Sequence, residues 1–393
     1  MKTMYLHIGT PKTGTTALQR FFYDNRSVLE EKNYCFPIFP FSYDDAPDVR
    51  NAHFLIKLIY DEEGNVDKAA FDKRFLEACD IIKDSFSRVD NVILTDEVLW
   101  NFLFRRNSNF FIKLREQFDE KEYNIKVIVY LRPQYAYIDS LYRQWVRMGR
   151  TVQSWDDFIA DIPDRITVDY QEGVKYLEKS VGKDNVIVRR YLKQYYSGES
   201  GTIFEDFLNT IGLELDDDFN MPEEMANISM QNQYVELKRI LNHQIENYNS
   251  PRNDLGNVMF RFACNTCSSM NYKEDNTTLY NEEQRKQLVD RFEDSNNWIA
   301  KNYFDDDVLF REESIRVGNK WEWDAREQQE AMLLFMGQMF IDREQELLER
   351  ERNLQSQINS LKSKCAKLEH KSIPLVVRGF RKLIRIITGT NKK

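Results

Sequence analysis

Short apolar runs alternate with longer segments of helical periodicity through the first half of the chain. Four runs are rich in β-branched residues, at positions 4–8, 92–95, 126–131 and 186–188. Continuous apolar runs of this length are typical of parallel strands that are covered on both faces. In the segments between them, apolar residues recur at spacings of three and four, as in amphipathic helices. The pattern predicts an α/β fold with a parallel sheet flanked by helices.

The pattern becomes helical from residue 201 onward. Apolar residues at three and four spacing predict helices over 202–212, 232–248 and 282–303 that cover the core. By contrast, the stretch 33–50 carries three prolines among aromatic residues, which predicts a loop packed by its own side chains. A lid over the carboxyl edge of the sheet is one role for this loop.

Beyond Asp324, large apolar residues recur at intervals of seven. They are Phe340, Leu347, Leu354, Leu361 and Leu368. The positions four residues after the first four of these hold Glu344, Glu351, Ile358 and Cys365, so half of the seam is polar. Two interpretations stay open, a coiled-coil homodimer and a long helix that packs on its own domain.

The segment 371–393 contains seven Lys or Arg residues and no acidic residue. Ser372 and Pro374 favour a helix start and Gly389 a helix stop, with apolar residues on one face and arginines opposite. A basic amphipathic helix is typical of peripheral membrane binding. The alternative is a terminal helix docked on an acidic face of its own domain. The predicted domains are therefore a body at 1–322, a long helix at 323–370 and this tail at 371–393.

Composition separates the tail from the rest of the chain. The 393 residues are 42% hydrophobic, enough for a large core, and carry a net charge of −9. Without the seven cations of the tail, 48 basic residues face 64 acidic ones, a charge of −16. This balance excludes a protein whose whole surface binds a nucleic acid polymer.

The five cysteines are scattered, which favours a reducing compartment over a disulfide scaffold. Cys264 and Cys267 have zinc-ligand spacing, but no second such pair accompanies them, so we expect structural thiols and no metal site.

With no leader-like start and no long apolar run, we expect a cytoplasmic protein, peripheral on the cytoplasmic face of the membrane through its tail.

Glycine is scarce, with 14 in the chain, yet Gly9 and Gly14 lie close together in HIGTPKTGTT at residues 7–16. The segment lies between the first predicted strand and a helix. Glycines allow a tight turn, the helix N-terminus presents N–H groups to an anion, and Lys12 adds a positive charge. A Walker A loop would have Lys directly after the second glycine, where this chain has Thr15. The sequence predicts a phosphate-binding loop of another kind, on a P-loop-like sheet.

The string PKTGTT at residues 11–16 resembles the 5'-phosphosulfate loop of sulfotransferases that use 3'-phosphoadenosine 5'-phosphosulfate (PAPS). After the third predicted strand, Arg132 followed by Ser140 resembles the 3'-phosphate motif of that family. The segments 186–213 and 295–304 look like the bacterial carbohydrate-type branch. The glycine- and lysine-rich stretch near the end of cytosolic small-molecule sulfotransferases has no counterpart here. The resemblance covers residues 1 to about 310.

The resemblance implies an enzyme, a PAPS-dependent sulfotransferase that moves a sulfuryl group to a hydroxyl or amine of a carbohydrate or glycolipid acceptor. It implies that Lys12 stabilises the leaving oxygen, and that no metal is required. The donor contacts that it implies are Lys12, Thr13, Gly14, Thr15, Thr16, Arg132, Ser140 and Arg189.

Sulfuryl transfer also needs a general base. Glu97 follows the second predicted strand at the same edge of the sheet, and by similarity to family members with a glutamate base we expect it to be the base. Asp96 is an alternative, because adjacent strand residues face opposite sides. His53 is a further alternative. We expect His7, inside the first strand, to be structural.

Two other functions remain open at this stage. A P-loop kinase or nucleotide triphosphatase shares the fold class but requires a Walker A loop and magnesium carboxylates that the sequence does not display. A non-catalytic, membrane-associated coiled-coil adaptor could keep the same fold.

Overall fold

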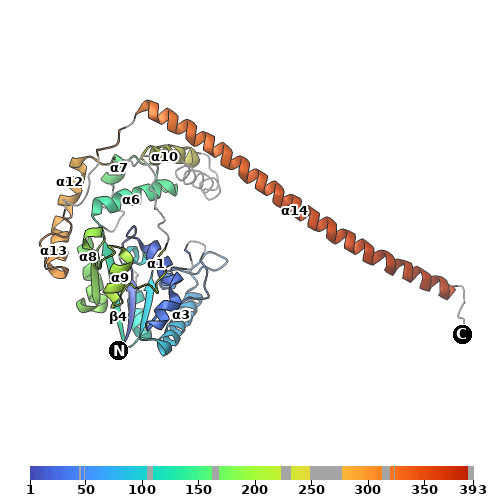
Figure 1. Cartoon of the computed structure of the whole chain (residues 1–393), viewed down its shortest axis with the longest axis horizontal. Coiled ribbons are helices and arrows are strands. Elements are labelled where there is room, and N and C mark those ends of the chain that lie inside the picture. Colours follow the sequence, from blue (N-terminus) through green and yellow to red (C-terminus); the bar gives the residue numbers. More distant parts are fainter. Residues whose placement is uncertain are drawn as a thin grey trace. The chain divides into compact units, whose positions relative to one another are not determined.

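The computed structural model describes residues 1–387 except for 44–45, 48, 104–108, 162–167, 223–231, 248–276, 312–318 and 323. The described residues up to Glu322 form one compact unit and those from Asp324 onward belong to another. Each unit is described by itself (Figure 1).

The first unit is built on a five-stranded sheet in which every pair of neighbours is parallel, in the order β2-β3-β1-β4-β5. The strands are β1 (Lys2–His7), β2 (Tyr34–Cys35), β3 (Asn91–Thr95), β4 (Tyr123–Leu131) and β5 (Val186–Arg190). Four of them coincide with the predicted apolar runs. The fold-class prediction is confirmed. The two-residue strand β2 lies in the predicted loop 33–50, and its length gave no periodic signal.

Helices connect and cover the strands. Their bounds are α1 (Thr15–Asp24), α2 (Arg26–Glu31), α3 (Lys68–Arg88), α4 (Val98–Phe102), α5 (Phe110–Gln117), α6 (Gln134–Arg147), α7 (Trp155–Ala160), α8 (Tyr170–Val181), α9 (Ile203–Ile211), α10 (Asn232–Asn247), α12 (Glu282–Arg291) and α13 (Glu293–Tyr303). The predicted helix over 282–303 is two helices that meet at Phe292. Short 3₁₀ turns occur at His53–Leu55, Lys183–Asn185 and Lys193–Tyr195.

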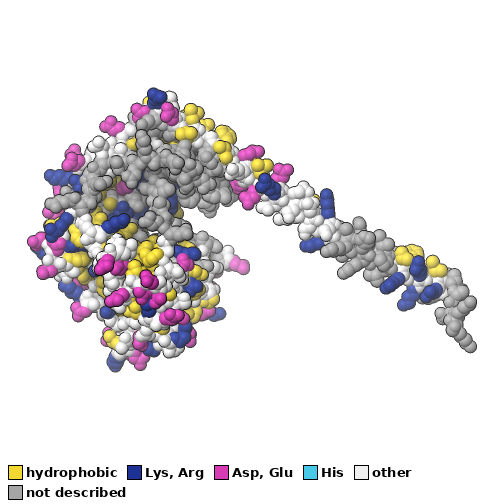
Figure 2. Space-filling view, viewed as in Figure 1, with side chains coloured by type: hydrophobic (Ala, Val, Ile, Leu, Met, Phe, Trp, Pro, Cys, Tyr) yellow, Lys and Arg dark blue, Asp and Glu magenta, His cyan; other side chains and the backbone are white. Residues whose placement is uncertain are grey.

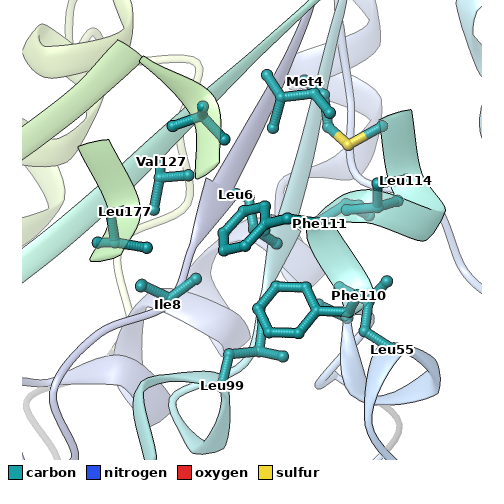
Figure 3. Close-up of a cluster of buried hydrophobic side chains, with 14 of the residues drawn as sticks. Met4, Leu6, Ile8, Leu55, Leu99, Phe110, Phe111, Leu114, Val127 and Leu177 are labelled. Atoms are coloured by element: carbon teal, nitrogen blue, oxygen red, sulfur yellow. The ribbon is translucent and has the colours of Figure 1, made fainter. Parts of the chain in front are cut away.

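Alternating residues of β1 supply two separate cores. Met4, Leu6 and Ile8 belong to a cluster with residues of α3, α5 and α8 on one face (Figure 3). Tyr5 belongs to a second cluster with residues of α1 and α9 on the other face. Because side chains of a strand point alternately to its two faces, the continuous apolar run is the pattern that a doubly covered strand requires.

The register brings several chain segments to one edge of the sheet. His7 at the end of β1 pairs with Thr95 at the end of β3 and with Ile128 of β4. The segments after β1, β3 and β4 therefore leave the sheet at its carboxyl edge, where parallel α/β folds bind ligands.

The second unit is dominated by one helix, α14 (Ala325–Ile387), of 63 residues. The sequence predicts a separate tail helix beginning near Ser372, whereas the structure continues α14 through Pro374. Proline inside a helix removes one hydrogen bond from the ladder and its ring crowds the carbonyl four residues earlier, at a cost of about 3 kcal/mol or more. Gly389 lies outside the described residues. No described helix is long and apolar enough to cross a membrane.

Candidate active site

The segment between β1 and α1 forms a tight loop. Its backbone has positive φ at Gly9 (30°), Lys12 (72°) and Gly14 (72°). Gly14 is the N-cap of α1 and provides no side chain to its first turn. The first N–H groups of a helix lack partners within the helix, and here no capping side chain accepts from them. They can therefore donate to an anion bound in the loop. A left-handed conformation at Lys12, a residue that rarely adopts it, is a strain typical of functional sites.

Two threonine hydroxyls maintain the shape of the loop. The Thr10 hydroxyl donates to the carbonyl of Tyr130 in β4 at 2.9 Å, and the Thr13 hydroxyl donates to the Thr10 carbonyl at 2.6 Å. Both side chains are fully buried. The Thr13 hydroxyl is thus engaged within the loop, and the role of Thr13 as a donor contact stays a prediction. Thr15 is also buried, while Thr16 and Gly14 retain some exposure.

Lys12 lies at the centre of a group of charges. Burial lowers the pKa of its ammonium, and the guanidinium groups of Arg147 and Arg132 lower it further, while the Glu97 carboxylate raises it. Lys12 belongs to the loop and Arg147 to α6. Arg132 directly follows β4, and Glu97 lies in the segment after β3. An anion bound among the three cations would offset the repulsion that Arg132 and Arg147 exert on the protonated Lys12 ammonium.

Arg132 is held directly against the loop. Its guanidinium donates to the Lys12 carbonyl at 3.1 Å, and its own carbonyl accepts from the Tyr170 hydroxyl at 2.7 Å. Ser140 lies two turns into α6, which starts just after Arg132, and is partly exposed. The structure thus brings Arg132 to Lys12, and the joint binding of one phosphate by Arg132 and Ser140 stays a prediction.

Arg189 takes part in a buried ion-pair network. Its guanidinium forms an ion pair with Asp206 of α9, a carboxylate with no solvent exposure. Asp206 also accepts from the Tyr130 hydroxyl at 2.7 Å and from the Ser197 backbone at 2.7 Å. A buried carboxylate requires such partners, so this network accounts for Arg189. The ion pair gives Arg189 a structural role between β5 and α9, and its assignment as a donor contact stays a prediction.

Tyr191 is a residue of the site that sequence reasoning missed. It follows β5, and its backbone N–H donates to the Leu131 carbonyl at 2.7 Å. A Cβ placed on Gly14 would lie 3.2 Å from the Tyr191 hydroxyl and 3.1 Å from Ile203 Cδ1. The phenol therefore lies against the N-cap of α1. Its position directly after an apolar run at the carboxyl edge was the available signal.

Glu97 is bound by two side chains. Its Oε1 accepts from Arg50 at 2.5 Å and its Oε2 from Gln19 of α1 at 3.3 Å. The Glu97 side chain is 14% exposed, so it is mostly buried but still in contact with solvent. The Arg50 guanidinium holds the carboxylate close to the loop that carries Lys12.

Asp96 and His53 form a second pair beside it. His53 Nδ1 lies 2.6 Å from Asp96 Oδ2, and Asp96 Oδ1 accepts from the Val98 backbone at 2.8 Å. The Asp96 side chain has no exposure, and that of His53 has 6%. A carboxylate on Nδ1 fixes the orientation of an imidazole and directs Nε2 to act as an acceptor of protons. The adjacent carboxylates thus do face different partners, as expected for neighbouring residues at a strand end.

His7 lies beneath the loop. Its Nδ1 is 3.0 Å from the Thr95 hydroxyl, and its ring packs edge-on against Phe207 and Tyr130. Burial lowers the pKa of His7 to about 3, so the imidazole is neutral at physiological pH. These contacts agree with a structural role.

Most of the aromatic and basic face of α6 belongs to the core. Tyr142 is buried against Trp155 and Phe158, and Arg143 pairs with Asp139 at 2.9 Å. Arg147 is the residue of this stretch that acts on Lys12.

Within the described residues there is no group of three or more His, Cys, Asp or Glu side chains that could hold a metal ion. Cys264 and Cys267 lie outside the described residues.

Comparison with known proteins yields one structural likeness. No protein-family model and no curated protein matches the chain. Among solved structures, the chain is similar to the crystal structure of a sulfotransferase from Alicyclobacillus acidocaldarius. The alignment covers 62% of this chain and 94% of that one, with 15% sequence identity and a TM-score of 0.36. A likeness at this level carries no argument about activity, and the proposal below rests on the site.

Proposed function

We propose that this protein is a sulfotransferase that uses PAPS as donor. The observation that carries the proposal is the contact of the Arg132 guanidinium with the Lys12 carbonyl, at a glycine loop that ends in a helix N-terminus. Arg147 adds a further positive charge that acts electrostatically on Lys12. Such a cradle suits a highly anionic donor with phosphate groups at two positions. Lys12 precedes the second glycine, which argues against a nucleotide triphosphatase of the Walker A type.

Each residue then has a task in the in-line transfer. The N–H groups of the first turn of α1 bind the 5'-phosphate, and Arg132 with Ser140 binds the 3'-phosphate. As the bond between sulfur and the bridging oxygen breaks, Lys12 stabilises the negative charge that develops on that oxygen. The acceptor oxygen forms the new bond to sulfur and gives up its proton to the base.

Glu97 is the base that we propose, because its carboxylate acts electrostatically on Lys12 and is partly exposed. Arg50 donates to Glu97 Oε1 at 2.5 Å and so fixes the orientation of this carboxylate. His53, oriented by Asp96, is the rival base. Substitution of each distinguishes them, as set out in the Discussion.

The acceptor class that we propose is a hydroxyl or amine of a carbohydrate or glycolipid, on the basis of the motif resemblance. The test is incubation with radiolabelled PAPS and separated glycan and glycolipid fractions, followed by detection of label in the acceptor. Transfer to a fraction that depends on Lys12 supports the proposal. Absence of transfer to every fraction, together with no binding of the desulfated donor, would remove it.

We also propose that the tail 371–393 binds an anionic membrane surface. Among its described side chains, Val377, Phe380 and Leu383 are 42% to 65% exposed. Figure 2 shows hydrophobic side chains on one side of the last described part of α14 and Lys and Arg side chains on the other. Each cation near an anionic surface contributes about 1 kcal/mol.

Co-sedimentation with vesicles tests the tail. We expect the full chain to bind vesicles that contain phosphatidylserine and not vesicles of phosphatidylcholine alone. A chain that ends at Lys371 should remain in the supernatant with both. Equal binding by the two chains would contradict the membrane proposal without affecting the enzymatic one.

A further inference from the structure

The long helix carries an apolar seam that its own unit leaves exposed. Phe340 is 72% exposed, Leu347 is 45% exposed, and Leu354 and Leu361 are each 59% exposed. None of the four belongs to either of the described core clusters. Large side chains at intervals of seven lie along one stripe of a helix and are costly to leave in water.

We propose that α14 pairs with α14 of a second copy of this chain as a parallel, in-register, two-stranded coiled coil. The leucines occupy the d positions of the heptad, and the a positions are Glu344, Glu351, Ile358 and Cys365. A β-branched residue at a with Leu at d favours two strands over three or four. Ile358 lies between Leu354 and Leu361 and is 44% exposed, so it is available for such packing.

The charges beside the seam explain why two glutamates are tolerated within it. Each glutamate at an a position directly follows an arginine at a g position, Arg343 before Glu344 and Arg350 before Glu351. In a parallel pair, g residues of one helix flank the a residues of the other, so the arginines of each copy face the glutamates of its partner. Each glutamate also faces its own counterpart in the in-register pair, and the arginines of the partner offset this repulsion.

The same positions disfavour an antiparallel pair. Four of the g positions are basic, namely Arg343, Arg350, Lys364 and Lys371. An antiparallel pair places g opposite g and brings these cations together. In the parallel pair, g faces the e position of the next heptad, and Lys364 then meets Glu369. No g and e partners in the parallel register carry like charges.

The contacts that the arginines make within one helix do not compete strongly. Arg350 lies 3.1 Å and Arg343 3.2 Å from Glu346. The two arginine side chains are 65% and 48% exposed, and ion pairs at such exposure contribute little. They can exchange this partner for a glutamate of the second copy.

Light scattering after size exclusion tests the pairing on the full chain. We expect a mass of two chains of 47.0 kDa each at micromolar concentration. Leu354→Glu at a d position should lower the mass to one chain. Ser356→Glu adds the same charge two residues away at an outward f position and should keep the mass of two chains. A single-chain mass for the unmodified protein, or a two-chain mass that survives Leu354→Glu, would overturn the proposal.

A disulfide tests the orientation. In the parallel register Cys365 of one copy faces Cys365 of the other. Dioxygen with a copper–phenanthroline catalyst should accept the two electrons and two protons of these thiols and leave a covalent dimer. Cys365→Ser should abolish that dimer and leave the mass in solution unchanged. A two-chain mass with no Cys365-dependent covalent dimer would contradict the parallel arrangement. Both readouts are independent of sulfuryl transfer, so they stand or fall separately from the proposed function.

Discussion

The two sides of the sheet's carboxyl edge differ in how their charges are matched. On the side of β1 and β4, Lys12 and Arg132 have no carboxylate within ion-pair distance among the described residues. On the side of β3, each carboxylate has a partner, Arg50 for Glu97 and His53 for Asp96. We propose that the cationic side binds an external anion, and that the acidic side accepts the proton of the acceptor.

Lys12→Ala should break the cationic side with the largest effect. It removes the charge that opposes the developing negative charge, and we expect turnover to fall by on the order of 100-fold or more. The measurement is the initial rate of label transfer from PAPS to an accepted glycan fraction. Lys121→Ala, at an exposed position far along the chain, serves as the control and should leave the rate unchanged.

The acidic side is tested by Glu97→Gln and His53→Ala compared under the same conditions. If Glu97 is the base, Glu97→Gln should lower turnover by about 100-fold and leave the affinity for the desulfated donor intact, because general base catalysis contributes about 100- to 10,000-fold. His53→Ala should then cause the smaller loss. The reverse ranking would transfer the role of base to His53 with Asp96 as its positioning residue.

Gly14→Ala sharpens the comparison at the loop. The added methyl would lie 3.1 to 3.2 Å from Tyr191 and Ile203. The alanine would also have to adopt the left-handed φ of 72° that Gly14 has. Donor affinity should fall by about 10-fold, equivalent to about 1.4 kcal/mol. Gly64→Ala is a matched control, because Gly64 has φ of 84° and nothing within 4 Å of the added carbon. Equal donor affinity in both variants would show that the contact with Tyr191 does not shape the loop.

His7 lies between the two sides and should affect stability through pH. Its pKa is about 3 in the folded protein and about 6.5 in an unfolded chain. Between these values the unfolded state binds more protons, so stability should fall as pH falls, by up to about 1.4 kcal/mol per pH unit. Urea unfolding at several pH values should show a shallower acid dependence for His7→Phe. The same slope in both proteins would contradict a buried neutral His7.

Sequence alone predicted the architecture because doubly covered strands leave continuous apolar runs. It also placed Lys12 and Arg132, since a glycine loop and a strand end fix where the following backbone goes. It gave no sign of the ion pair between Arg189 and Asp206, because the burial of Asp206 is a tertiary property. The sequence also did not predict the pairings of Glu97 with Arg50 and of Asp96 with His53. The segment around His53 and the end of β3 are far apart in the sequence and meet only in the folded protein.

The most direct test of the account is calorimetric titration with 3'-phosphoadenosine 5'-phosphate and, separately, with ATP and magnesium. We predict tight binding of the first, weakened by at least about 10-fold in Arg132→Ala through loss of charge-assisted hydrogen bonds, and no binding of ATP. Binding of ATP without 3'-phosphoadenosine 5'-phosphate would contradict the proposed sulfotransferase and favour a nucleotide triphosphatase or kinase on the same sheet.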